Sequence, residues 1–174
     1  MQNIDNEKLI ATLDESASAL KSAVADLSDE IAAQRPHSER WSALENIEHL
    51  ILVEEMIRNR IAAAEPTGEP VHNPEREAQL PGRVALRDTR FTAPPVAWPK
   101  GRFDSVRVAL EQFDATRRDT ARFISEHGPK LRCVHLQHPV FGNLSGYEMV
   151  LVLAGHAHRH ANQILEGIAQ STRF

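Results

Sequence analysis

The chain has 174 residues, of which 41% are hydrophobic, and this length and composition are typical of one domain, residues 1–174, whose core needs no disulfide staples. Its net charge of -4 and pI near 6.1 disfavour a nucleic-acid partner, and its single cysteine, Cys133, excludes an internal disulfide and a multi-cysteine zinc site. Because the N-terminus lacks a signal-peptide pattern and no apolar run reaches the roughly 18 residues that span a bilayer, we expect a cytoplasmic protein with no membrane partner.

Two amphipathic helices are predicted in the first third of the chain. In residues 6–29, leucine, valine and alanine side chains recur at three- and four-residue steps, which indicates one apolar stripe on a helix. Pro36 and the polar residues after it break this pattern. A second helix is expected from Ser42, because Ser42 and Glu45 form a capping box, and its broad apolar face continues until shortly before Pro66.

A proline-rich connection follows the second predicted helix. Seven prolines lie in residues 65–102, and this density excludes a long helix or a central strand. We expect the segment to wrap the structure, with a short helix near residues 83–88 and with Phe91 and Trp98 fastening it to the body.

Two more helices are predicted after this connection. The first begins near residue 104 and ends before Gly128, and an irregular stretch follows at residues 130–147. Ser145 and Glu148 form a second capping box, so the last helix is expected over residues 146–169. Four helices of roughly 20 residues predict an all-α fold, a four-helix bundle with a long proline-rich crossover between its second and third helices.

Three histidines are candidate metal ligands. His156 and His160 lie four residues apart, and this spacing returns to nearly the same face of a helix. His49 is the best candidate for a third ligand, because bundles assemble metal sites from facing helices. Three imidazoles with an open position are typical of a catalytic zinc site and also suit nickel or iron. The alternative is that the pair only makes hydrogen bonds at a helix surface, since such spacing also arises by chance in a chain with nine histidines.

Residues close in sequence to the three histidines limit which class of metal site the chain can form. Ala157 follows His156 where the zinc-protease motif H-E-x-x-H carries its glutamate base, so a protease is disfavoured. His158 falls on another side of the helix from His156 and is not expected to join the metal. Glu45 lies one turn before His49 and could orient it, although helix capping is the commoner role. The sequence assigns no firm role to Glu45, Cys133, His158 and Gln163.

Three stretches together resemble the DinB-like superfamily. They are residues 41–50 (WSALENIEHL), 138–145 (HPVFGNLS) and 156–164 (HAHRHANQI), and the resemblance covers nearly the whole chain. It implies a metal-binding four-helix bundle that is commonly dimeric, and its three ligands correspond here to His49, His156 and His160.

The resemblance also implies a kind of chemistry. Characterised members of the superfamily include enzymes that use low-molecular-weight thiols such as mycothiol, bacillithiol or glutathione, either transferring the thiol or isomerising a substrate with it. We therefore expect a divalent metal ion, zinc or nickel, a small-molecule substrate or thiol, and a homodimer. The alternative is a non-catalytic bundle in which the ion has a structural or regulatory role. A stress-linked DNA-binding protein is disfavoured by the acidic composition.

Overall fold

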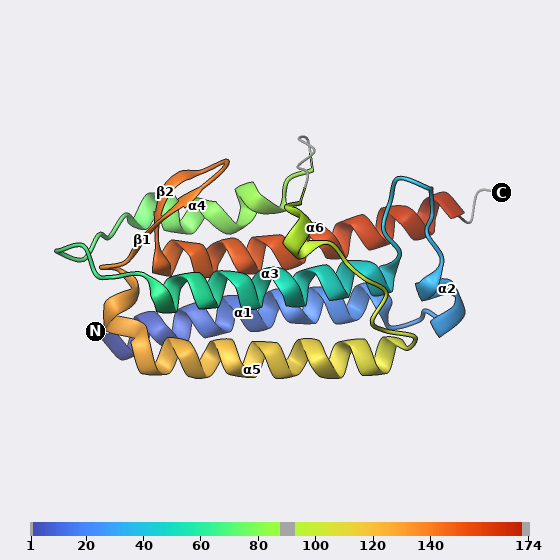
Figure 1. Ribbon diagram of the computed structural model, residues 1–174, viewed down its shortest axis with the longest axis horizontal. Coiled ribbons are helices and arrows are strands. Elements are labelled where there is room, and N and C mark those ends of the chain that lie inside the picture. The colour runs from blue at the N-terminus through green and yellow to red at the C-terminus, as the bar shows by residue number, and fades with distance from the viewer. Residues whose placement is uncertain (1, 88–92, 172–174) are drawn as a thin grey trace.

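Four long helices form the body of the protein. The computed structural model describes residues 2–87 and 93–171, and the bundle consists of α1 (Gln2–Val24), α3 (Ala43–Ala63), α5 (Val106–Leu131) and α6 (Gly146–Ser171). In Figure 1, α1 and α6 run from left to right, whereas α3 and α5 run from right to left. The predicted four-helix bundle is confirmed. None of the described helices is long and apolar enough to cross a membrane.

The core lies between these helices in two hydrophobic clusters. One cluster includes Leu9, Ile57 and Leu131, and the other includes Leu20 and Phe113, all of them almost fully buried. Burial of these side chains supplies most of the driving force for folding. The helices are therefore held side by side by the apolar stripes that their sequences predict.

Two capping boxes begin the helices where the sequence predicts them. The Ser42 hydroxyl accepts the Glu45 backbone N–H at 3.1 Å, and the Glu45 carboxylate accepts the Ser42 backbone N–H at 2.8 Å. Ser145 and Glu148 make the same exchange at the start of α6, at 3.2 and 2.8 Å. Both starts are confirmed, because a capping box satisfies free amide groups through side chains close in sequence.

The first helix ends earlier than predicted. It stops at Val24, and the separate short helix α2 (Asp29–Ala33) follows, so the prediction of one helix over residues 6–29 was wrong at its end. Ser28 explains the break, because its hydroxyl accepts the Ile31 backbone N–H at 3.3 Å and caps α2.

The connection between α3 and α5 contains the 12-residue helix α4 (Pro74–Ala85) and the single turn η1 (Pro95–Ala97). The predicted short helix at residues 83–88 was placed too late, and residue 88 lies outside the described part of the chain. Pro74 occupies the first turn, where a missing N–H costs nothing, and α4 continues through Pro81. Packing against α6 compensates for that proline, because Gly155 lets the α4 backbone approach closely.

Of the two predicted aromatic anchors, Trp98 does not fasten this connection to the body. Phe91 lies outside the described residues, and Trp98 is 50% exposed, with its indole N–H donated to the nearby Ala93 carbonyl at 2.8 Å. The prediction for Trp98 was therefore wrong. Ala97, which is 1% exposed, is the residue that packs against the bundle at this point.

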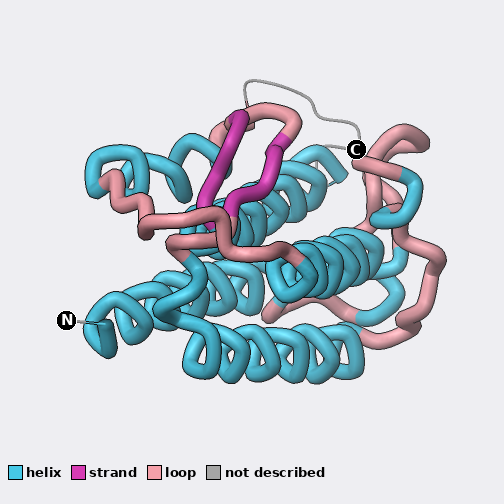
Figure 2. The backbone as a smooth tube through the Cα atoms, turned by 60° about the vertical axis from the view of Figure 1, so that its left-hand side comes forward, coloured by secondary structure: helices cyan, strands magenta, loops and turns pink. Residues whose placement is uncertain are grey.

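The end of α5 and the stretch after it also differ from the prediction. The helix passes through Gly128 and Pro129 and ends at Leu131, and Gly128 packs closely against the Asn6 side chain of α1. The segment predicted to be irregular contains an antiparallel hairpin of β1 (His135–His138) and β2 (Gly142–Ser145), drawn in magenta in Figure 2. Gly142 makes its turn possible with a φ of 72°.

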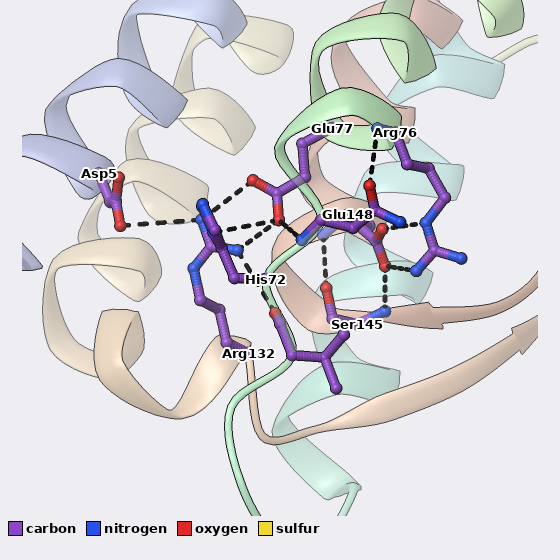
Figure 3. Close-up of polar contacts among 9 residues, drawn as sticks. Asp5, His72, Arg76, Glu77, Arg132, Ser145 and Glu148 are labelled. Carbon is purple, nitrogen blue, oxygen red and sulfur yellow. Dashed lines mark hydrogen bonds and ion pairs between the residues drawn. The ribbon is translucent and has the colours of Figure 1, made fainter.

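Ion pairs fasten α4 to the end of the bundle, as Figure 3 shows. Arg76 of α4 forms a two-pronged contact with the buried Glu148 of α6, with one arm at 2.7 Å. Arg132, directly after α5, binds Glu77 of α4 at 2.5 Å and lies 3.7 Å from Asp5 of α1. Four helices thus meet in one polar network.

Candidate metal centre

The three predicted histidines meet between α3 and α6. The Nε2 atom of His156 lies 3.3 Å from Nε2 of His49 and 3.0 Å from Nε2 of His160. All three ligand atoms lie within 4.8 Å of one another, and His158 is not part of the group. The antiparallel packing of the two helices brings His49 to the face that carries the other two.

The distances fit a metal ion. A tetrahedral ion bound to imidazole nitrogens at about 2.0–2.1 Å separates those nitrogens by roughly 3.3–3.4 Å. The separations of 3.3 and 3.0 Å are close to this value, and the third pair of ligand atoms, from His49 and His160, lies within 4.8 Å. His49, His156 and His160 could therefore hold a divalent ion without rearrangement of the helices.

The Ala97 carbonyl sets the protonation of His49. Its oxygen lies 2.7 Å from Nδ1 of His49, and a carbonyl can only accept a hydrogen bond. Nδ1 therefore carries the proton in the neutral ring. Nε2, the atom that faces the other histidines, is left with a free lone pair.

Asn46 does the same for His160. Its Oδ1 lies 2.6 Å from Nδ1 of His160, while its Nδ2 donates to the carbonyls of Ser42 at 2.8 Å and Trp41 at 3.3 Å. Because both of those partners can only accept, the orientation of the amide follows from its contacts. Nδ1 of His160 is then the donor, and its Nε2 lone pair also faces the cluster.

Burial keeps these rings neutral. It lowers the pKa of His49, an effect that the hydrogen bond to Ala97 only partly opposes. Burial, followed by the neighbouring histidines, places the pKa values of His156 and His160 well below the usual range. Neutral imidazoles are the form that binds metals. The Nε2 lone pairs of His49 and His160 are therefore available to a cation between the rings, or to the Nε2–H of a neutral His156.

The histidine cluster is covered by Trp41 on one side and is partly exposed to solvent on the side of His156. The Trp41 ring lies 4.6 Å from the ring of His49 and 6.2 Å from that of His160, centre to centre. His49 is 3% exposed and His160 is 6% exposed, whereas His156 is partly exposed. An open coordination position would therefore face the side of His156.

The sequence analysis missed three residues that surround the ligands. Asn46 and Ala97 orient His160 and His49, and Glu48 holds the backbone of the segment that contains Ala97. Asn46 could have been predicted from the sequence, since a polar residue three positions before His49 lies on the same helix face. The Ala97 carbonyl carried none, because a backbone contact across 48 residues depends on the tertiary fold.

The other residues with open roles lie away from the ligand atoms. The Glu45 carboxylate is bound by the Ser42 backbone and by Arg35, which confirms its capping role. Gln163 accepts a hydrogen bond from Arg87 at 2.8 Å. Cys133 follows the end of α5, where α6 begins, about 15–20 Å along that helix from the site histidines.

Comparison with known proteins identifies similar chains. A model of the DinB superfamily matches residues 12–164. The uncharacterised protein YuaE of Bacillus subtilis (strain 168) is 30% identical over 145 residues, which cover 80% of this chain and 85% of that protein. YfiT from Bacillus subtilis, described as a probable metal-dependent hydrolase with an unusual four-helix bundle topology, has a solved structure with a TM-score of 0.60. The match covers 94% of this chain and 86% of YfiT at 17% identity, so it speaks for the fold alone.

Proposed function

Because this chain belongs to the DinB superfamily, we propose that it is a metal-dependent enzyme that activates a low-molecular-weight thiol at an ion held by His49, His156 and His160. The observation that carries the proposal is the convergence of three Nε2 atoms, two of them with their protonation set by outside partners. A divalent ion, zinc or nickel, would lower the pKa of a thiol that occupies its open position.

The residues around the ligands suit a thiol nucleophile. A free thiol has a pKa of about 8.5, so it needs little help to ionise at neutral pH. The ligand group in the described part of the chain contains no carboxylate, and the nearby Glu48 carboxylate is occupied by backbone N–H groups. A metal ion at this site would therefore stabilise the thiolate form of a bound thiol, and no separate general base would be needed. Transfer of the thiol to an electrophile, or isomerisation of a substrate through it, would follow.

A hydrolase is the second candidate. The description of YfiT as a probable metal-dependent hydrolase favours it, because YfiT shares this fold. Hydrolysis would use water at the same open position and needs a proton donor for the leaving group. A non-catalytic bundle, in which the ion only joins α3 to α6, is the third.

Cobalt substitution separates these candidates. Cobalt-loaded protein is titrated with glutathione, bacillithiol and mycothiol, and turnover is followed with a model aryl chloride whose chloride leaves as the sulfur bonds to carbon. We expect a new thiolate-to-cobalt absorption band and thiol-dependent chloride release. Both are expected to persist in His158→Ala, the matched control between the two ligands of α6, and to disappear in His156→Ala.

Other results would favour the other candidates. Thiol-independent cleavage of a nitrophenyl ester, with no spectral change on adding thiols, would replace the thiol enzyme with a hydrolase. Neither activity, with a cobalt spectrum that no thiol changes, would leave the non-catalytic bundle.

The proposal extends to partners. We propose a cytoplasmic homodimer that binds a small-molecule substrate or thiol and no nucleic acid, in keeping with the net charge of -4. Sedimentation analysis of the purified protein tests the dimer, and a salt-sensitive shift of duplex DNA would contradict the absence of nucleic-acid binding.

A further inference from the structure

Glu48 is a buried carboxylate directly before His49 in α3. Its side chain is 1% exposed. Oε1 accepts the Lys100 backbone N–H at 2.9 Å, and Oε2 accepts those of Gly101 and Arg102 at 2.9 and 3.0 Å. Successive backbone N–H groups that converge on one anion form a nest. Gly101, whose φ is 74°, provides the left-handed conformation on which this nest depends.

The segment that Glu48 binds is the one that orients His49. Ala97 lies three residues before Lys100, and its carbonyl accepts the hydrogen bond from Nδ1 of His49 at 2.7 Å. The nest and the carbonyl therefore join one short stretch of chain to two adjacent residues of α3.

Apolar packing gives this stretch little support near the histidine. Ala97 is 1% exposed, but its neighbours Val96 and Trp98 are 67% and 50% exposed. Lys100 and Arg102 are also exposed, so the backbone of the nest covers the Glu48 carboxylate from the solvent side. Between the buried Ala97 and the partly buried Phe103, the polar contacts with Glu48 hold the exposed backbone of residues 100–102 on α3.

We propose that Glu48 is a positioning residue for the metal centre. By holding the backbone of Lys100, Gly101 and Arg102, it keeps the Ala97 carbonyl on Nδ1 of His49, and so keeps the Nε2 lone pair aimed at the ion. The inference rests on the proposed function, since affinity for the ion is one of its two tests. Partners that orient a ligand in this way typically contribute 10–100-fold to metal affinity, roughly the effect expected here.

Glu48→Gln tests the hydrogen bonds of the nest and preserves the shape of the side chain. The amide keeps one acceptor oxygen but turns an NH2 group toward a backbone N–H donor, so part of the nest is lost. We expect zinc affinity, measured by competition with a chromophoric chelator, to fall by about 10–100-fold. Glu148→Gln is the matched control, because Glu148 is also 1% exposed and also accepts a backbone N–H, but at the start of α6. It is expected to lower thermal stability and leave zinc affinity within about threefold of wild type.

A second pair of variants acts from the segment itself. Gly101→Ala strains the nest without touching α3, since no heavy atom lies within 4 Å of the added carbon. Gly142→Ala places similar strain, at a φ of 72°, in the hairpin before α6. We expect zinc affinity to fall in the first and to stay at the wild-type level in the second.

The protonation of His49 gives a readout that needs no metal. In nitrogen-15 spectra of the metal-free protein, we expect His49 to be protonated at Nδ1 in wild type and to populate both tautomers in Glu48→Gln. Zinc affinity and Nδ1 protonation that both stay at wild-type levels in Glu48→Gln would overturn the proposal. A wild-type protein that binds no zinc would overturn the proposed function instead, and the tautomers of His49 would then decide the role of Glu48.

Discussion

A backbone carbonyl and a side-chain amide determine which nitrogen is free in two of the three site histidines. The Ala97 carbonyl accepts a hydrogen bond from Nδ1–H of His49, and Oδ1 of Asn46 accepts one from Nδ1–H of His160. Both free Nε2 atoms then face Nε2 of His156, whose single N–H can satisfy only one of them fully, so at least one lone pair is left for a ligand. A local conflict of this kind is expected at a functional site, where the ligand resolves it.

A second group of residues, at the junction of α4 with the bundle, links charge to stability. Burial by itself would raise the pKa of Glu77. Hydrogen bonds from Arg132 and from the Asn73 backbone, together with the Arg132 charge, lower the pKa by more than burial raises it. The net pKa therefore lies below its ordinary value of 4.5. Such a carboxyl stabilises the fold fully above the unfolded-state pKa and loses that contribution as the pH falls through the folded-state pKa.

Glu77→Gln is therefore expected to destabilise the protein at neutral pH but not in acid. Hydrogen bonds to charged groups contribute about 1.5–3 kcal/mol, and each kcal/mol lowers the melting temperature of a protein of this size by roughly 2–4 °C. The gap in melting temperature between variant and wild type is expected to narrow as the pH falls below the ordinary pKa of 4.5 and through the lower folded-state pKa. Glu75→Gln, an exposed change in the same helix, is the control. A gap for Glu77→Gln that is as large in acid as at neutral pH would contradict this account.

At the scale of elements, α4 shows how packing can override local sequence. Pro81 removes one hydrogen bond from inside the helix, and the proline density of residues 65–102 argues against a long helix there. The helix forms nevertheless, because it buries Leu80 and Val84 against α6 and is joined to it by Arg76 and Glu148. Its close approach depends on Gly155, the residue just before His156.

Gly155→Ala is expected to push α4 away from α6. The added carbon would lie 2.7 Å from Cβ of Val84 and would overlap the Pro81 carbonyl, which cannot rotate away. We expect a loss of about 1–3 kcal/mol in chemical denaturation and faster amide exchange throughout α4.

Gly82→Ala provides the matched control within α4. Nothing lies within 4 Å of a carbon added there, so the change is expected to stabilise the helix by about 0.5–1 kcal/mol. Equal stability of the Gly155→Ala and Gly82→Ala proteins would show that the contact between α4 and α6 is not close.

At the scale of the whole molecule, the features that could be predicted are those set by residues close together in the sequence. Apolar stripes and the capping boxes at Ser42 and Ser145 predict the bundle and two helix starts, because those interactions are local. The histidine spacing likewise predicts one face of α6. The start of α4 also has local signals, the capping Asn73 and Pro74 in its first turn. Its passage through Pro81 and the nest around Glu48 depend on contacts between segments far apart in sequence, which no local pattern reveals.

Metal analysis tests the central claim most directly. Protein purified without chelators or a histidine-rich tag, then offered zinc or nickel, is analysed beside variants of the three ligands and His158→Ala. The account predicts a stoichiometric divalent ion in wild type and in His158→Ala, and its loss in His49→Ala, His156→Ala and His160→Ala, because each removes a ligand atom. A wild-type protein that takes up no metal, or ligand variants that retain as much as His158→Ala, would contradict it.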